Sequence, residues 1–238
     1  MAIDSFNFSP GRVLAKKYEV VRQLGGGWEG EVYLVKEQLT GIERAAKFFY
    51  PERNIRNKTL KTYANKLHKL RHCPILVKYL AQDFMQFKGE SITFLISDFV
   101  EGEVMATYLK GQPGNRLPIF QALHLLYALA QGVEPIHLMG EYHGDLHSEN
   151  VIVNQIGINY HLKLLDLHHW GDSKRENIYE DVCNLIHLFY EALGGKAHYT
   201  KQPKAIKNII CGLKRSLILQ KYKTAGQLRE YLETFTWE

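Results

Sequence analysis

Short apolar-rich segments bounded by turn residues dominate the first hundred residues, which is the pattern of strands. A glycine-rich stretch joins the first two segments, so this pair is predicted to form a hairpin. Between residues 58 and 70 the apolar residues instead recur at helical spacing, with lysines between them, and a helix is predicted there. The strands are predicted at residues 18–24, 31–36, 43–50 and 93–100.

After residue 100 the apolar residues follow helical spacing over much of the chain. Two short strands interrupt this pattern at residues 150–153 and 161–165, with a turn at Gly157 between them. The pattern predicts an α+β fold, with a strand-rich domain over residues 1–100 and a mainly helical domain over residues 101–238. The helices are predicted at residues 117–139, 181–193, 204–219 and 224–234.

The composition is that of a soluble globular protein. The chain has 238 residues, of which 45% are hydrophobic and 12% aromatic, and its net charge of +5 does not by itself identify a nucleic-acid binder. The N-terminus does not resemble a signal peptide, and no segment approaches the ~18 apolar residues of a membrane span, so we expect a cytoplasmic protein without a membrane partner. The widely spaced cysteines are expected to be buried free thiols: Cys73, Cys183 and Cys211.

The first predicted hairpin carries Gly25, Gly27 and Gly30, followed by Val32. Glycines at this spacing let backbone amides approach phosphate oxygens, because no side chain lies in the way. An ordinary glycine-rich turn is the alternative. The position between two strands, rather than between a strand and a helix, argues against a dinucleotide-binding fold and favours a flap over a nucleotide.

Lys47 lies in the next predicted strand, after Ala45 and Ala46. A lysine in an apolar strand either extends its ammonium group to solvent or binds an anion. Its position behind the glycine-rich hairpin favours a role in holding nucleotide phosphates.

The strongest motif is His-Gly-Asp-Leu-His-Ser-Glu-Asn at residues 143–150, between the long predicted helix and a predicted strand. Through the pattern His-x-Asp-Leu-x-x-x-x-Asn the chain resembles the protein-kinase superfamily. Phosphoryl transfer needs a carboxylate that orients the acceptor hydroxyl, together with oxygen ligands for magnesium on the phosphates. The resemblance implies that Asp145 is the catalytic base and Asn150 a magnesium ligand.

The resemblance covers residues 18–235 and implies a two-lobed kinase-like fold with ATP and Mg²⁺ as cofactors. Asp166 matches the aspartate of the Asp-Phe-Gly motif, which implies that it is the main magnesium ligand. Asp181 resembles the aspartate that braces the catalytic loop, and a simple helix cap is the alternative. Ser97 takes the place of the gatekeeper. Lys47 is implied to be catalytic, and the implied nucleotide-binding residues are Gly25, Gly27, Gly30, Val32, Ala45, Lys47, and the backbone of Asp98 and Val100.

The helix after Lys47 departs from the family pattern. Family members carry a glutamate on this helix that pairs with the lysine, whereas the corresponding place here is Tyr63 or Ala64, and residues 55–71 contain no acid. We therefore expect Lys47 to lack this partner or to borrow Glu52 or Glu31. The missing glutamate keeps a nucleotide-binding pseudokinase as an alternative.

The region of the usual activation segment is also reduced. Gly144 stands where family members carry an arginine that binds a phosphorylated activation loop, and only fifteen positions separate Asp166 from Asp181. No Ala-Pro-Glu motif occurs between them, and Tyr222 occupies the place of the arginine that pairs with that motif. These losses agree with one another and predict a compact atypical kinase that is constitutively active.

His147 leaves the acceptor open. Serine/threonine kinases commonly carry a lysine there, whereas Gly-Asp-Leu-His is similar to aminoglycoside and choline phosphotransferases, and the short activation segment is similar to RIO-type kinases. The favoured function is a serine/threonine protein kinase, and a small-molecule kinase that phosphorylates a hydroxyl group is the alternative. The basic stretch 53–71 is interpreted as a solvated helix face in preference to a site for an acidic partner such as RNA.

Overall fold

The computed structural model describes residues 3–169, 171 and 173–236. Within them the chain forms two compact units. The first contains residues up to 71 and residues 77–100, and the second contains residues 72–76 and 101–238. Residues 72–76 were predicted to lie in the first domain, residues 1–100. They group with the second unit because Leu164 donates its backbone N–H to Ile75 O and because Leu76 forms a β-bridge with Leu164.

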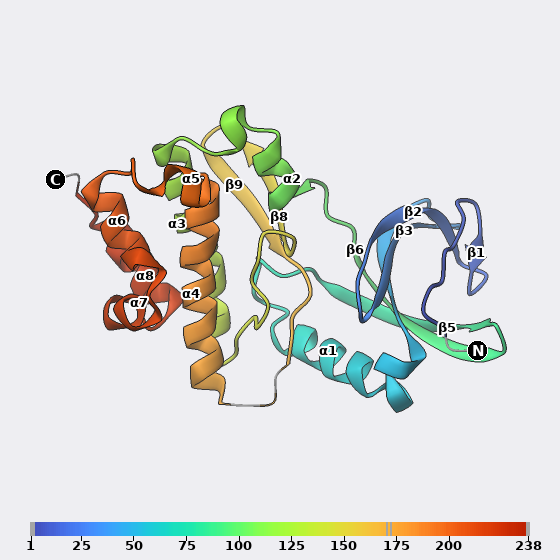
Figure 1. Cartoon of the computed structure of the whole chain (residues 1–238). Helices are drawn as coiled ribbons and strands as arrows, with labels where there is room; N and C mark the ends of the chain where they lie inside the picture. Colours follow the sequence, from blue (N-terminus) through green and yellow to red (C-terminus); the bar gives the residue numbers. More distant parts are fainter. Residues whose placement is uncertain (1–2, 170, 172, 237–238) are drawn as a thin grey trace. The chain divides into compact units, whose positions relative to one another are not determined.

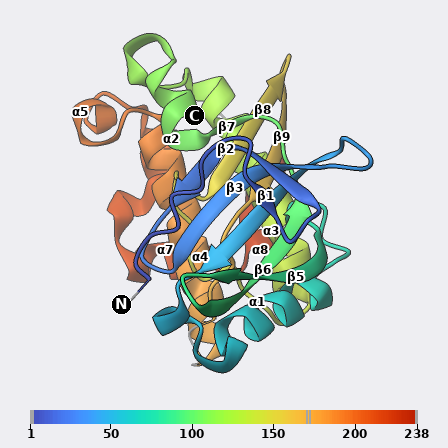
Figure 2. The same ribbon diagram turned by 90° about the vertical axis from the view of Figure 1, so that its right-hand side faces the viewer.

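The first unit is built on an antiparallel sheet, which is blue to green in Figure 1. Within the described residues this sheet has six strands in the order β1-β2-β3-β4-β6-β5. Helix α1, Lys58–Lys69, lies along the β5–β6 side of the sheet, as Figure 2 shows. The strands are β1 Val13–Leu14, β2 Tyr18–Gly26, β3 Gly30–Glu37, β4 Glu43–Phe49, β5 Tyr79–Phe87 and β6 Glu90–Asp98.

The two faces of this sheet bury different clusters, because successive side chains of a strand point to opposite faces. Ala46 and Phe48 of β4 belong to a large cluster that also contains Phe6 and Phe8 of the N-terminal segment. Phe49 instead packs with Leu60 of α1 and Leu95 of β6. Burial of an aromatic or large aliphatic side chain stabilises a fold by ~1.5–3 kcal/mol, so the N-terminal segment is a structural part of the sheet's core.

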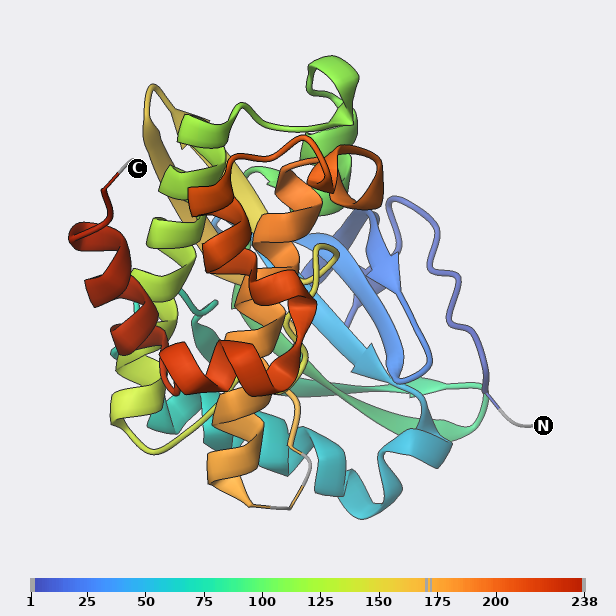
Figure 3. The same ribbon diagram turned by 60° about the vertical axis from the view of Figure 1, so that its left-hand side comes forward.

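The second unit is mainly helical, and Figure 3 brings its helices forward. Helix α3, Ile119–Leu138, packs against α4, Lys174–Ala192, and α8, Ala225–Glu233. A small antiparallel sheet in the order β7-β8-β9 lies beside α3. The remaining elements are β7 Glu103–Val104, α2 Met105–Lys110, β8 Val151–Ile156, β9 Asn159–Leu164, α5 Gly195–Tyr199, α6 Lys204–Ile210 and α7 Arg215–Lys221.

Two helix predictions for this unit were wrong in their extent. Helix α4 begins at Lys174 rather than at Asp181, because its first turn is polar and largely exposed and so carries no apolar periodicity. The segment predicted as one helix over residues 204–219 is broken. Cys211 has φ +53° and Gly212 has φ +59°, and these left-handed residues end α6 before α7 begins.

The structure also contains elements that the sequence analysis did not predict. Strand β5 was missed because most of its side chains are at least partly exposed, and its polar residues hide the strand pattern. Helix α2 and strands β1 and β7 are too short to show a period. No helix in the described part of the chain has the length and hydropathy needed to cross a membrane.

Candidate functional site

The glycine hairpin joins β2 and β3. Gly25 pairs with Val32 and Gly26 with Glu31, and the Gly27 N–H donates to Gly30 O over 2.9 Å. A Cβ on Gly30 would lie 1.8 Å from Phe48 O, so only glycine lets β3 approach β4 here. A Cβ on Gly25 or Gly27 would meet nothing within 4 Å. The internal packing therefore requires Gly30, whereas the other two glycines leave the hairpin's backbone open to a ligand.

Three of the predicted nucleotide-binding residues lie on one face of the first sheet: Val32, Ala45 and Lys47. Lys47 pairs with Val32 of β3 and with Leu95 of β6, and Ala45 pairs with Ser97. Since residues two apart on a strand point to the same face, Ala45 and Lys47 share a face with their cross-strand partners. The Ser97 hydroxyl donates to Ala45 O over 3.5 Å.

Glu29 places a carboxylate beside Lys47. The Lys47 Nζ lies 3.6 Å from Glu29 Oε2 and 4.7 Å from the centre of the Tyr63 ring. Glu52 pairs with Arg53, over 3.6 Å. The prediction that Lys47 borrows a carboxylate from outside the helix is confirmed, but Glu29 of the glycine hairpin was not among the acids named for it.

The Glu31 carboxylate is hydrogen-bonded to the N-terminal segment. Its carboxylate is buried and accepts the backbone N–H of Phe6 over 3.0 Å and that of Asn7 over 3.3 Å. It also accepts hydrogen bonds from the hydroxyls of Tyr33 and Tyr50. Four donors thus satisfy this buried carboxylate, which is what a charge inside a protein requires.

At the end of β6, Asp98 is held from two sides. Its backbone N–H donates to Lys78 O over 3.1 Å, and its carboxylate accepts from Arg44 Nη1 over 3.0 Å. The N–H of Asp98 is therefore occupied, and what its backbone can offer a ligand is the carbonyl oxygen. Val100 lies just beyond the strand and is half-buried.

In the second unit, Asp145, His147 and Asn150 lie in contact. The Asn150 side-chain amide donates to Asp145 Oδ2 and to Asp145 O, each over 3.0 Å. The His147 Nε2 lies 3.5 Å from Asp145 Oδ2 and 2.9 Å from Asn150 Nδ2. The Asp145 side chain is 45% exposed, so a solute can reach its carboxylate. Because Asn150 uses its amide nitrogen within the loop, its Oδ1 is the atom that a cation would bind.

A buried carboxylate fixes this loop from below. Asp181 is fully buried in α4, and it accepts the N–H of His143 over 2.6 Å and that of Gly144 over 2.9 Å. His137 Nδ1 accepts the N–H of Ala225, so the proton of the neutral imidazole lies on Nε2, 3.2 Å from Asp181. Asp181 lies inside α4 rather than at its first turn, so the alternative of a helix cap was wrong and the brace was predicted correctly.

Gly144 is a glycine for a structural reason. Its φ is +88°, and a Cβ there would lie 2.9 Å from the Tyr142 ring and 3.1 Å from His168 O. An arginine in this conformation would be strained and would clash.

Asp166 follows β9 and adopts a left-handed backbone with φ +53°. The residues around it bond to the motif of residues 143–150: the Leu165 N–H donates to Asn150 O and the His168 N–H donates to His143 O, each over 2.9 Å. The structure thus brings Asp166 next to the loop that carries Asn150. Aspartate tolerates the left-handed region better than most residues do, because its short polar side chain can bond locally.

Other predicted features are structural. Tyr222 is buried and its ring packs on Tyr231, and burial raises the pKa of its hydroxyl. The cysteines are free and buried, as predicted. Among the described residues, no group of three or more His, Cys, Asp and Glu side chains could hold a metal ion. Magnesium in proteins commonly keeps several waters and binds substrate phosphates beside one or two protein oxygens.

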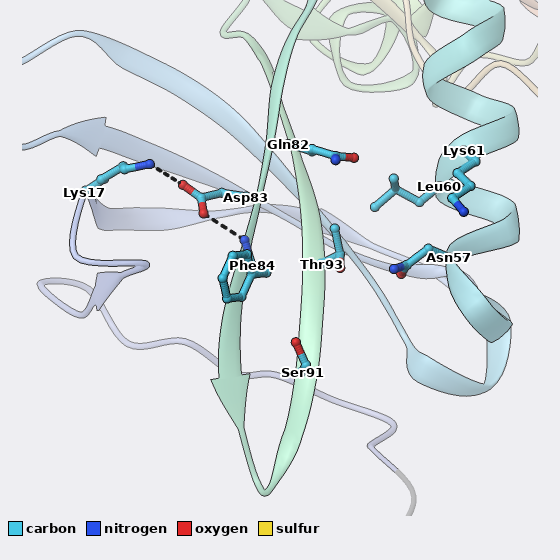
Figure 4. A pocket seen from close by; sticks show the side chains of 9 residues that line it. All are labelled: Lys17, Asn57, Leu60, Lys61, Gln82, Asp83, Phe84, Ser91 and Thr93. Carbon is cyan, nitrogen blue, oxygen red and sulfur yellow. Dashed lines mark hydrogen bonds and ion pairs between the residues drawn. The ribbon is translucent and has the colours of Figure 1, made fainter.

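A separate groove of about 400 Å³ lies in the first unit between the start of α1 and the β5–β6 hairpin. Figure 4 shows Leu60 and Lys61 of α1 on one side and Phe84 on the other, with Lys17 paired to Asp83 over 2.8 Å. The groove contains none of the residues that the sequence analysis assigned to a nucleotide or to catalysis.

The comparisons with known proteins agree on one family. The model of the protein kinase domain matches residues 18–202. The serine/threonine-protein kinase pkn2 of Myxococcus xanthus is 34% identical over 159 residues, which are 65% of this chain and 18% of that protein. The Aurora kinase of Schizosaccharomyces pombe is 28% identical over 189 residues, which are 77% of this chain and 50% of that protein. This chain therefore spans half or less of the length of these two curated relatives.

Solved structures share the fold. The crystal structure of the Mycobacterium tuberculosis PknI kinase domain matches with a TM-score of 0.65 and 17% identity, and the match covers 97% of this chain and 100% of that one. At this identity the likeness concerns the fold, which combines an antiparallel-sheet unit with a helical unit, as predicted for an α+β chain.

Proposed function

We propose that this chain, which belongs to the protein kinase domain family, is an ATP- and magnesium-dependent kinase that phosphorylates serine or threonine residues of a protein. The observation that carries the proposal is the contact between Asp145, Asn150 and His147 in a loop braced by the buried Asp181. The curated relatives that support the choice of acceptor are serine/threonine kinases by name.

The chain offers suitable groups for both ATP and magnesium. Hard cations prefer oxygen ligands, and we assign Asn150 Oδ1 and the Asp166 carboxylate to magnesium. When bound, magnesium neutralises charge on the phosphates. The residues assigned to ATP are Gly25, Gly27 and Gly30 of the hairpin, Lys47, and the adenine-side residues Val32, Ala45, Asp98 and Val100.

Asp145 is assigned as the base. Its Oδ2 accepts from the Asn150 amide, which fixes the carboxylate while leaving it accessible to an acceptor hydroxyl. A carboxylate in this position can orient the hydroxyl and accept its proton. His147, whose Nε2 lies 3.5 Å from the same oxygen, occupies the place of the family's lysine, and we assign it to contact the transferred phosphate.

We place this activity in the cytoplasm, where ATP is available and thiols stay reduced, which suits the buried free cysteines. The reduced segment between Asp166 and Asp181 favours an enzyme that needs no activating phosphorylation.

Incubation with labelled ATP, magnesium and a general protein substrate tests the proposal. We expect phosphate on serine or threonine, and Asp145→Ala should reduce the rate to background. ATP use only in the presence of aminoglycosides or amino alcohols would identify a small-molecule kinase instead. ATP binding without transfer to any of these acceptors would identify a pseudokinase.

A further inference from the structure

The helix that follows Lys47 cannot supply the lysine with a carboxylate, since residues 55–71 contain no acid. At the corresponding place Tyr63 presents its ring, whose centre lies 4.7 Å from Lys47 Nζ. The Phe49 ring lies 5.3 Å from the same atom. Aromatic faces attract an ammonium group, but a ring accepts no directed hydrogen bond that would fix where its N–H groups point.

A carboxylate reaches Lys47 from the glycine hairpin instead. Glu29 Oε2 lies 3.6 Å from Lys47 Nζ, and the two side chains are only 23% and 12% exposed. The partial burial strengthens their attraction relative to an ion pair in water. Glu29 is therefore placed differently from an exposed turn acid, whose charge solvent would screen.

The backbone holds Glu29 in this position. The Tyr50 N–H donates to Glu29 O over 2.9 Å, and the Gly27 N–H donates to Gly30 O over 2.9 Å, so the turn is closed on both sides of Glu29. The next acid along the strand, Glu31, is bonded to Phe6 and Tyr50 and belongs to the opposite face. The hairpin thus carries two acids with separate tasks.

We propose that Glu29 is the positioning residue for Lys47 and performs the task of the missing helix glutamate. The inference rests on the proposed function, in which Lys47 binds the nucleotide phosphates. An ammonium group has three donors, so Lys47 can keep Glu29 and still donate to phosphate oxygens. Glu29 lies on the hairpin that we assign to cover the nucleotide. When this hairpin becomes ordered over the nucleotide, it therefore also orients Lys47, and helix α1 is not required for this step.

The test removes the charge of Glu29 and retains its shape. Glu29→Gln should reduce kcat/KM for ATP roughly tenfold or more, because Lys47 loses a charged partner in a partly buried site. It should also weaken equilibrium binding of ATP-magnesium. Glu52→Gln is the matched control, since Glu52 is an exposed acid paired with Arg53, and both its kinetics and its nucleotide affinity should equal those of the wild type.

Relocation of the carboxylate separates positioning from a general structural effect. In the double variant Glu29→Gln/Tyr63→Glu the acid returns to the helix, and we expect kcat/KM and ATP affinity to recover most of the loss. Thermal unfolding of each variant shows whether the chain stays folded. If Glu29→Gln lost activity because it unfolds, its Tm would fall and the double variant would not restore ATP affinity.

Wild-type kcat/KM and wild-type ATP affinity in folded Glu29→Gln would overturn the inference. A failure of the proposed function is distinguishable, because it would appear as ATP binding without phosphoryl transfer in the wild type. In that case the affinity comparison of wild type, Glu29→Gln and the double variant still decides whether Glu29 positions Lys47.

Discussion

At the scale of single residues, backbone conformation decides which side chains the motif of residues 143–150 can carry. Gly144 combines a left-handed φ of +88° with close neighbours on the side where a Cβ would project. In this conformation the backbone N–H groups of His143 and Gly144 both donate to the Asp181 carboxylate. The absence of the family's arginine is therefore coupled to the way the loop is held, and a side chain at Gly144 should disturb both.

Gly144→Ala should destabilise the chain more than Gly140→Ala. Both glycines have positive φ, but a Cβ on Gly140 meets nothing within 4 Å, whereas one on Gly144 meets the Tyr142 ring and His168 O. Left-handed strain costs ~1–3 kcal/mol, and the clash adds to it only at Gly144. Equal shifts of the denaturant midpoint for the two variants would contradict this account.

The hydroxyl of Tyr50 should make the stability of the chain depend on pH in the alkaline range. Burial, followed by the hydrogen bond to Glu31, raises its pKa from 10.0 to about 12. The folded state therefore holds the phenolic proton more tightly than the unfolded state. The stability from this effect is fully present below pH ~10 and is lost as the pH rises toward ~12.

The stability difference between wild type and Tyr50→Phe should consequently shrink between those two pH values. Urea unfolding at several alkaline pH values measures it. The variant serves as its own reference, because phenylalanine keeps the ring and removes the titrating group. A difference that stays constant over this range would exclude the Tyr50 hydroxyl as the cause.

At the scale of elements, the N-terminal segment contributes buried side chains to the core on one face of the first sheet. Phe6 and Phe8 are 3% and 5% exposed and join the cluster around Phe48. Phe6→Ala should cost ~3–5 kcal/mol, as other buried Phe→Ala changes do. Phe84→Ala removes the same group from a side chain that is 64% exposed and should cost far less. Similar free energies of unfolding for the two variants would show that the segment adds little to the core.

The elements also show what sequence could and could not predict. The glycine hairpin, the strand of Lys47 and the helix over residues 58–70 were predicted correctly because each carries a strong local pattern. The start of α4 was missed because its first turn is polar. The partner of Lys47 was missed for a different reason: the pairing of Glu29 depends on how the hairpin folds back over β4, which spacing along the chain does not record.

At the scale of the whole molecule, the features that this chain lacks are those through which a phosphorylated activation loop acts in the family. Gly144 has no side chain to bind such a loop, and Tyr222, in place of another family arginine, is a buried ring against Tyr231. Helix α4 already begins at Lys174, so little chain separates it from Asp166. If Glu29 positions Lys47, a movement of helix α1 is not needed to switch activity on either.

We therefore expect phosphatase treatment to leave the specific activity of this chain unchanged. Phosphorylation activates a kinase by adding charge that arginine side chains bind, and the chain lacks the usual arginine in the loop at Gly144. Activity toward a protein substrate, measured before and after dephosphorylation and removal of the phosphatase, tests this, with mass spectrometry to verify that phosphate is gone. A large loss of activity that preincubation with ATP restores would reveal a phosphorylation switch outside the family's usual segment, and the proposal of a constitutive kinase would then be wrong.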